Sequence, residues 1–344
     1  MERQTKFFDR EILLAHGSGG KISRRLVEGL IAPIFASDEL DKLGDAGSVK
    51  VGDEEVLVTT DSYVVHPIRF PGGSIGELAV NGTVNDLAVS GAEPLGITIA
   101  LILEAGLKTT ELRRELEAIK AAAVKVGVDI VTGDTKVVEH SKADMMFITS
   151  TGVGRRHPRA NLAASRVVPG DRLLLSGPIG DHGITILLAR GDLDIVADQL
   201  RSDTRAVWPM VRALLDNFGP SIKWMRDPTR GGLATTLNEF AIASQLRVVI
   251  EEEAIVVHDE VRGACEILGL DPFHIANEGQ FVAVVDPECA DEALALLRRI
   301  DGGDEARLIG SVEASEVPIV VCKTPYGASR VLDMLTGDPL PRIC

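Results

Sequence analysis

The chain has 344 residues, of which 45% are hydrophobic and 25% charged, a globular composition long enough for two domains. Asp and Glu total 51 against 36 Lys and Arg, so the net charge is −15. A surface of that sign repels phosphate backbones and anionic membranes, and neither nucleic acid nor a membrane is expected as a partner. A polyanionic ligand would need carboxylates that hold a divalent cation to offset the repulsion.

The N-terminal segment, residues 1–41, combines a glycine-rich loop with a helix. The loop reads "AHGSGGK" (15–21), which on its own is typical of a flexible turn. The run "ISRRLVEGLIAPIF" (22–35) repeats apolar residues at helical spacing and predicts an amphipathic helix. Because no GxGxxG fingerprint opens a βαβ unit, a dinucleotide-binding domain is not expected.

Residues 42–155 are predicted to form one α+β domain. Apolar runs bounded by turn residues predict strands at 54–65, 94–104, 129–138 and 145–155, and helical periodicity predicts helices at 74–92 and 109–128. In the second helix we expect Thr110 to cap the N-terminus, Glu111 to favour the first turn and Gly127 to end it.

Residues 165–322 are predicted to form a second domain that mixes strands and helices. It opens with a strand, a glycine turn and a helix within 166–190, and continues with helices in 203–218, 225–244 and 291–300 and strands in 247–253, 279–286 and 317–323. Residues 323–344 are predicted to be a tail, extended at its end, because they hold little apolar periodicity and include Pro325, Pro339 and Pro341. Ile343 can supply a small apolar anchor.

No segment of the sequence is typical of export or of membrane insertion. The longest apolar run, "LGITIALILEAGL", is too short and too interrupted to span a bilayer, so a cytoplasmic location is expected. The cysteines are far apart and form no CxxC pair, which argues against a zinc site or a disulfide framework. Cys344, the last residue, is expected to be a free thiol.

Acidic side chains recur beside glycine or small residues at predicted strand ends and turns. They are Asp45, Asp61, Asp86 with Asn85, and Asp134 with Lys136. Each one taken alone is typical of a helix cap or a turn. Together in one domain they favour a site where hard oxygen ligands converge on Mg²⁺ and leave room for a phosphate.

Two further motifs can carry chemistry. "DPTRGGL" has the form of a glycine turn that opens a helix, so Gly231 and Gly232 can present backbone N–H groups to an anion, or Asp227 can simply cap the helix. "FHIANEGQF" places His274 and Glu278 before a strand, where a carboxylate is either a general base or a solvated loop charge.

The ordered series Asp45, Asp61, "NDLAVSGA", "GDTK", "DPTRGGL" and "NEGQ" resembles the ATP-binding family of aminoimidazole ribonucleotide synthetase, selenophosphate synthetase and thiamine-monophosphate kinase. Within that family, "AHGSGG" near the start and "PRIC" at the end are similar to the hydrogenase-maturation carbamoyl dehydratases. The resemblance covers nearly the whole chain, and its paired end motifs are its most specific part.

The resemblance implies an α+β fold of two domains, with a mixed N-terminal sheet that forms a β-barrel with a second subunit of a homodimer. It also implies ATP between the domains, with Mg²⁺ held at Asp45, Asp61, Asp86 and Asp134. The implied nucleotide-binding residues are Gly17, Ser18, Gly19, Gly20, Lys21, Asp61, Asn85, Asp86, Asp134, Asp227, Gly231 and Gly232.

The chemistry implied by the resemblance acts on the chain's own cysteine. A carbamoyltransferase partner, HypF, loads Cys344 with a carbamoyl group, ATP activates the amide oxygen, and the resulting cyanide passes to a HypC–HypD complex. Lys136 is then expected to neutralise the phosphoryl group in transit, and Glu278, or alternatively His274, to act as base. The alternatives are a small-molecule kinase or ATP-dependent cyclase in which Cys344 is incidental, and a non-catalytic ATP-binding scaffold.

Overall fold

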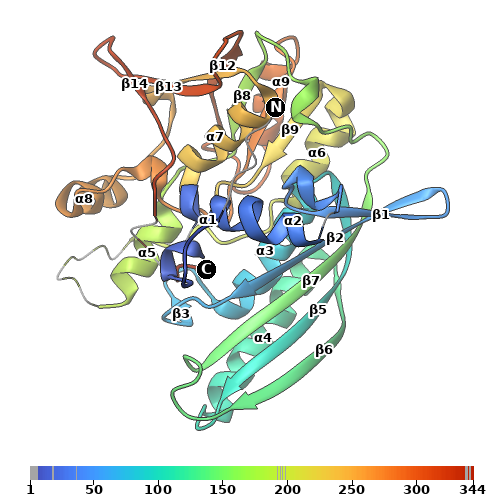
Figure 1. Ribbon diagram of the computed structural model, residues 1–344, viewed down its shortest axis with the longest axis vertical. Coiled ribbons are helices and arrows are strands. Elements are labelled where there is room, and N and C mark those ends of the chain that lie inside the picture. The colour runs from blue at the N-terminus through green and yellow to red at the C-terminus, as the bar shows by residue number, and fades with distance from the viewer. Residues whose placement is uncertain are drawn as a thin grey trace.

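The computed structural model describes residues 7–17, 19–35, 37–191, 193, 195, 197, 199–337, 340 and 342–344. The predictions for Ser18, Pro339 and Pro341 lie outside the described residues. Each of the two domains is built around its own β-sheet, as Figure 1 shows.

The N-terminal sheet has the strand order β1-β2-β7-β5-β6, and all its pairs are antiparallel except β5 with β6. Its strands are β1 (Gly47–Val51), β2 (Glu54–Tyr63), β5 (Ala92–Glu104), β6 (Asp129–Val138) and β7 (Met146–Arg156). The helices α3 (Ile75–Val89) and α4 (Thr109–Val126) pack on one face. Helix α4 connects β5 to β6, which is why these two strands can run parallel.

The C-terminal sheet has the strand order β14-β13-β10-β12-β8-β11-β9. Its strands are β8 (Arg172–Leu175), β9 (Ile222–Arg226), β10 (Arg247–Glu251), β11 (Val282–Val285), β12 (Arg307–Glu313), β13 (Ile319–Lys323) and β14 (Ser329–Val331), and its helices are α5 (Asp181–Ala189), α6 (Trp208–Phe218), α7 (Gly232–Ser244), α8 (Asp259–Leu268) and α9 (Ala290–Leu297).

Side chains of β8 and β11 alternate between two cores, because successive residues of a strand point to opposite faces. Leu174 packs in the same core as helices α6 and α9, whereas Leu173 and Leu175 pack in the core beneath α7. The first of these cores continues into the N-terminal domain through α3. The two domains therefore share one apolar interior along their junction.

The tail returns to the junction between the domains. In Figure 1 the C-terminal end lies near the centre of the molecule, close to α1 (Gly20–Leu26), α5 and the short strand β3 (Arg69–Phe70), which pairs with β4 (Gly73–Ser74). Leu340 and Ile343 are buried in the core that both domains share. The tail also contributes strand β14 to the edge of the C-terminal sheet, which the sequence did not predict.

Most predicted elements are present, with different ends. Gly127 ends α4 in the left-handed conformation as predicted, but the predicted cap at Thr110 is wrong, because Lys108 occupies the cap position. The predicted helix at 22–35 comprises α1, a π-helical turn (Val27–Ile31) and α2 (Ala32–Phe35). The predicted helix at 203–218 begins only at Trp208. No helix in the described ranges has both the length and the apolarity that a bilayer span needs.

Candidate metal and nucleotide site

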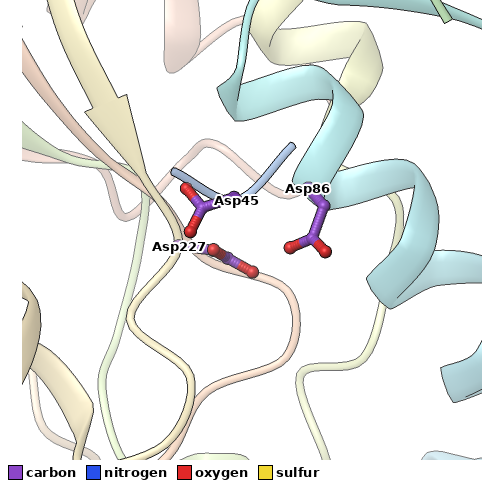
Figure 2. Close-up of side chains that lie close together, drawn as sticks. All are labelled: Asp45, Asp86 and Asp227. Carbon is purple, nitrogen blue, oxygen red and sulfur yellow. The ribbon is translucent and has the colours of Figure 1, made fainter. Parts of the chain in front are cut away.

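Three carboxylates from separate parts of the chain meet at the domain junction (Figure 2). Asp45 lies in the loop before β1, Asp86 in the last turn of α3 and Asp227 in the loop after β9. One oxygen of each lies within 4.8 Å of the others. Residues from both domains are therefore needed to assemble the group.

The carboxylates repel one another in a setting that water solvates poorly. Burial, followed by the neighbouring charges of Asp61 and Asp227, raises the pKa of Asp86 well above its ordinary value. Burial and the charge of Asp45 raise the pKa of Asp227 to about 8. Burial also raises the pKa of Asp61. Each of these groups would ionise more readily if a cation lay among them.

The donor set fits Mg²⁺, which prefers carboxylate oxygens and retains room for phosphate and water. The Thr59 hydroxyl lies 2.7 Å from Asp86 Oδ2 and 2.9 Å from the Asp45 carbonyl, which ties two of the three acidic segments together. The third, Asp227, follows directly on β9. Hydrogen bonds of Thr59 thus position Asp45 and Asp86, and Asp227 is positioned by the strand that it follows.

Arg226 fixes the orientation of Asp45. Its Nε donates to Asp45 Oδ1 at 2.8 Å, while its Nη1 and Nη2 donate to Glu239 and to the Leu43 carbonyl. This leaves Asp45 Oδ2 for a cation. Arg226 is a positioning residue that sequence reasoning missed, although it immediately precedes Asp227.

The acidic group opens into a cavity of about 240 Å³. Glu278 and Cys344 line the same cavity, as do Asp61, Thr229 and Arg230. The sequence analysis assigned no role to Arg230, although this residue lies inside the "DPTRGGL" motif. The negative charge at Cys344 is the largest cause of the raised pKa of the Arg230 guanidinium, and Asp61 and Glu278 add to it.

Glu278 is almost completely buried, and its backbone is fixed from outside the cavity. Burial, followed by the charges of Asp227 and Asp203, raises the pKa of Glu278 well above its ordinary value, while Arg230 opposes the shift. The Asp203 carboxylate accepts from the Glu278 N–H at 3.0 Å. A carboxylate with a raised pKa is a stronger base once it is ionised.

Two residues predicted for the site, Asp134 and Lys136, lie away from the acidic group of the same chain. Asp134 and Lys136 form an exposed ion pair on β6, with Lys136 Nζ 2.8 Å from Asp134 Oδ2. This corrects the predicted metal group for a single chain: Asp227, not Asp134, lies with Asp45 and Asp86. The reason is that β6 is the outer strand of its sheet, on the opposite edge from β1.

His274 and Asn85 are also engaged away from the cavity. His274 Nε2 lies 2.9 Å from the Asp333 carbonyl. Asn85 donates to the carbonyls of Arg205 and Glu278 and accepts from the Val207 N–H. Asn85 thus joins the domains and positions Glu278, and its predicted contact with nucleotide stays a prediction.

The glycines of the two motifs serve close packing rather than lining the cavity. Gly231 and Gly232 have positive φ at the start of α7, and a Cβ on Gly232 would lie 2.5 Å from the Ile275 carbonyl. Gly19 packs on Arg230, which lines the cavity. Gly17 ends the short helix Leu14–His16, Gly20 opens α1, and Lys21 pairs with Asp333 at 2.6 Å.

The two domains match one family of proteins. The model of the AIR synthase related protein N-terminal domain matches residues 43–156, and the model of the C-terminal domain matches residues 168–323. The chain is thus built as a two-domain protein of the AIR synthase related class.

Comparison with individual relatives identifies the family within this class. The chain is 47% identical over 331 residues to carbamoyl dehydratase HypE of Azotobacter vinelandii, covering 96% of each chain. A crystal structure of HypE in complex with ATP superimposes with a TM-score of 0.81 at 44% identity, covering 97% of this chain and 100% of that one. A HypE–HypF complex gives a TM-score of 0.85 at 39% identity, covering 90% and 99%. The chain belongs to the HypE family.

Proposed function

We propose that this protein is an ATP-dependent carbamoyl dehydratase that converts an S-carbamoyl group on its own Cys344 into an S-cyano group, and so supplies the cyanide ligand for [NiFe]-hydrogenase maturation. The observation that carries the proposal is that Cys344 lines one cavity with Glu278 and the Asp45, Asp86 and Asp227 group. Relatives named carbamoyl dehydratase HypE, and a HypE solved with ATP, support it.

The reaction requires that an amide oxygen become a leaving group. The thiocarbamate oxygen attacks the γ-phosphorus of ATP, the bond to the β–γ bridging oxygen breaks, and ADP departs. Loss of the N–H protons and cleavage of the carbon–oxygen bond then form the nitrile and release inorganic phosphate. The atoms balance as thiocarbamate plus ATP giving thiocyanate, ADP and phosphate, with the lost oxygen carried by the phosphate.

The chain's own residues divide these tasks. The Asp45, Asp86 and Asp227 group would hold Mg²⁺, which when bound would neutralise charge on the phosphates. Glu278 takes a proton from the amide nitrogen. Arg230, beside Cys344, offers a fixed positive charge to the oxygen that gains negative charge during transfer.

Intact mass spectrometry tests the sequence of steps. Incubation with the carbamoyltransferase HypF, the partner proposed from the HypE–HypF structure, should add one carbamoyl group at Cys344. Addition of Mg-ATP should then remove one water, and a HypC–HypD complex should accept the cyano group. Persistence of the carbamoyl mass in excess Mg-ATP would falsify the proposal.

Glu278→Gln separates loading from dehydration. The amide keeps the volume of the side chain but cannot accept the substrate proton, so we expect loading at the normal rate and dehydration slowed by roughly 10²–10⁴-fold. The measurement is the decay of the carbamoyl mass in a single turnover. Glu117→Gln, on the exposed surface of α4, is the matched control. An unchanged decay rate would remove Glu278 from the mechanism.

We further propose a homodimer in which β6 of one copy brings Asp134 and Lys136 to the site of the other. Val131 and Val137 on this outer strand are 64% and 67% exposed, and an apolar edge strand left uncovered promotes association. Val49 and Val51 on the opposite edge strand, β1, are likewise exposed. Two copies can bury these residues in one barrel.

Replacing both Val131 and Val137 by Asp should convert the dimer into a monomer, as measured by light scattering, because buried like charges oppose the pairing of the strands. The control is Val124→Asp on α4, which is equally exposed but lies away from both edges. If the site is shared, mixing a Lys136→Ala chain with a Glu278→Gln chain should restore part of the activity that each lacks alone. A wild-type protein that is monomeric throughout would refute the shared site.

A further inference from the structure

Residues Arg342–Cys344 lie along the segment that follows β2 and extend its backbone pairing. The Val64 N–H donates to the Cys344 carbonyl at 3.0 Å, and the His66 N–H donates to the Arg342 carbonyl at 3.4 Å. The two pairs run in opposite directions along the two segments, so the tail adds to Val64–His66 in the manner of an antiparallel strand.

Helix α5 supplies side-chain donors to the same backbone. His182 Nε2 lies 2.7 Å from the Ile343 carbonyl, and Arg190 Nη2 donates to the Arg342 carbonyl at 2.9 Å. Arg190 Nε also donates to the His66 carbonyl, so this guanidinium joins the two paired segments. Each backbone carbonyl from Arg342 to Cys344 therefore has a donor.

The tautomer of His182 follows from the groups at its two ring nitrogens. The Thr204 N–H donates to Ser202 Oγ at 3.1 Å, and Ser202 Oγ lies 2.7 Å from His182 Nδ1. The Ile343 carbonyl can only accept, so Nε2 carries the imidazole proton, and in the neutral ring Nδ1 then accepts from the Ser202 hydroxyl. Burial lowers the pKa of His182, which keeps the ring neutral in this arrangement.

Side chains of the tail are recognised as well as its backbone. The Ile343 side chain is 2% exposed, inside the core shared by the domains. Arg342 Nη2 donates to Asp144 Oδ2 at 2.9 Å, and its guanidinium lies 5.9 Å from the centre of the Phe147 ring. Asp144 also pairs with His66 Nδ1 at 2.9 Å. The contacts favour a basic residue followed by an apolar one, and they place the next residue, Cys344, at the cavity.

We propose that Val64–His66, Asp144, His182 and Arg190 form a peptide-docking groove whose ligand is an Arg–apolar–Cys segment, here the chain's own residues 342–344, and that His182 is the positioning residue that holds the Cys344 thiol at the acidic cavity. This groove extends the proposed function, because it specifies how the tail that carries the substrate is held at the active site. Only the use of the docked thiol rests on that function.

Alkylation of the intact protein measures docking without ATP or turnover. We expect His182→Phe, which removes the donor to the Ile343 carbonyl, to speed iodoacetamide labelling of Cys344 about tenfold, as the loss of one buried hydrogen bond implies. His182→Gln restores a donor near the Nε2 position and should return the rate to within about threefold of wild type. Peptide mass mapping reports each cysteine separately.

Two controls separate docking from general unfolding. Labelling of the half-buried Cys289 in the same sample reports any global loosening, and His157→Gln changes a histidine whose ring pairs with Asp216, away from the tail. Asp144→Lys disrupts the groove independently of His182, because it replaces the partly exposed ion pair of Asp144 with Arg342 by two like charges. This variant should also speed labelling of Cys344 but not of Cys289. Equal Cys344 rates in wild type, His182→Phe and Asp144→Lys would overturn the groove.

A second readout tests the ligand directly. In full-length Ile343→Asp the buried position of the tail becomes unfavourable, so the groove should be vacated and should bind a fluorescent synthetic peptide that ends in Leu-Pro-Arg-Ile-Cys. The same peptide with Asp in place of Ile should bind at least about tenfold more weakly. Equal binding of the two peptides would contradict the groove even if dehydratase activity is established.

Discussion

Cys344→Ser should leave Mg-ATP binding unchanged and abolish formation of the cyano product. Serine has nearly the shape of cysteine, so the tail can still dock, but its hydroxyl is far less acidic than a thiol and does not accept the carbamoyl group at neutral pH. We expect loading to fall by at least about 10³-fold, to the background of the assay. Nucleotide titration and intact mass measure the two properties separately.

The matched control is Cys289→Ser, a half-buried cysteine outside the cavity, which should load and dehydrate as wild type does. The alternatives give different results in the same assay. Turnover of a soluble substrate that survives Cys344→Ser would favour a small-molecule kinase or cyclase. ATP hydrolysis that stays negligible in the loaded wild-type protein would favour a scaffold.

The fold class was predictable because the elements of the two domains carry strong local signals. Helix α4 has an amphipathic pattern and ends at Gly127, where only glycine adopts the left-handed conformation without cost. The two-domain α+β architecture followed from such runs and from the family resemblance, and the comparisons confirm it. Helix α8 was missed although Asp259, Glu260 and Gly269 mark its ends.

The site was predictable in its residue types but not in its grouping. Each acidic residue taken alone is typical of a cap or a turn, and the site was recognisable because four such positions recur in one predicted domain. Which of them meet depends on how α3, the loop after β9 and the loop before β1 converge, and this is a tertiary property. No local sequence pattern therefore indicates that Asp227 lies with Asp45 and Asp86. Nor does any local pattern indicate that Asp134 lies on an edge strand of the same chain.

The contacts of the tail are a second tertiary property that the sequence did not predict. Its composition predicts a tail that is extended at its end, and the sequence alone left open whether it enters the site. Its residues lack apolar periodicity because the partners of Leu340 and Ile343 belong to a core built by both domains. Two apolar residues are buried there, and His182 and Arg190 add hydrogen bonds to the tail backbone, which no periodicity of side chains reveals.

Asp227→Asn should stabilise the protein in the absence of metal and remove its response to Mg²⁺. The pKa of Asp227 is about 8 in the folded chain, against an ordinary value of 3.8. An acid whose pKa is raised by folding makes the native state progressively less stable as the pH rises from the ordinary value to the raised one. The amide has no proton to lose, so that penalty disappears.

The effect has a defined pH window. Wild type and Asp227→Asn should melt alike near pH 4, and the difference should grow until about pH 8, where we expect the variant to melt roughly 3–8 °C higher. Thermal melts between these limits, with EDTA and then with Mg²⁺, make the measurement. Mg²⁺ should raise the melting temperature of wild type and leave the variant unchanged, because one of the ligand carboxylates is gone.

Asp53→Asn, in the exposed turn between β1 and β2, is the control for a change of charge without a change at the site, and it should keep both the pH profile and the response to Mg²⁺. A variant at Asp227 no more stable than wild type at pH 8 would show that the carboxylates do not strain the metal-free fold. A variant that is more stable than wild type at pH 8 would mean that the acidic group lowers the stability of the metal-free protein. The same repulsion among the carboxylates that lowers this stability is what attracts the cation.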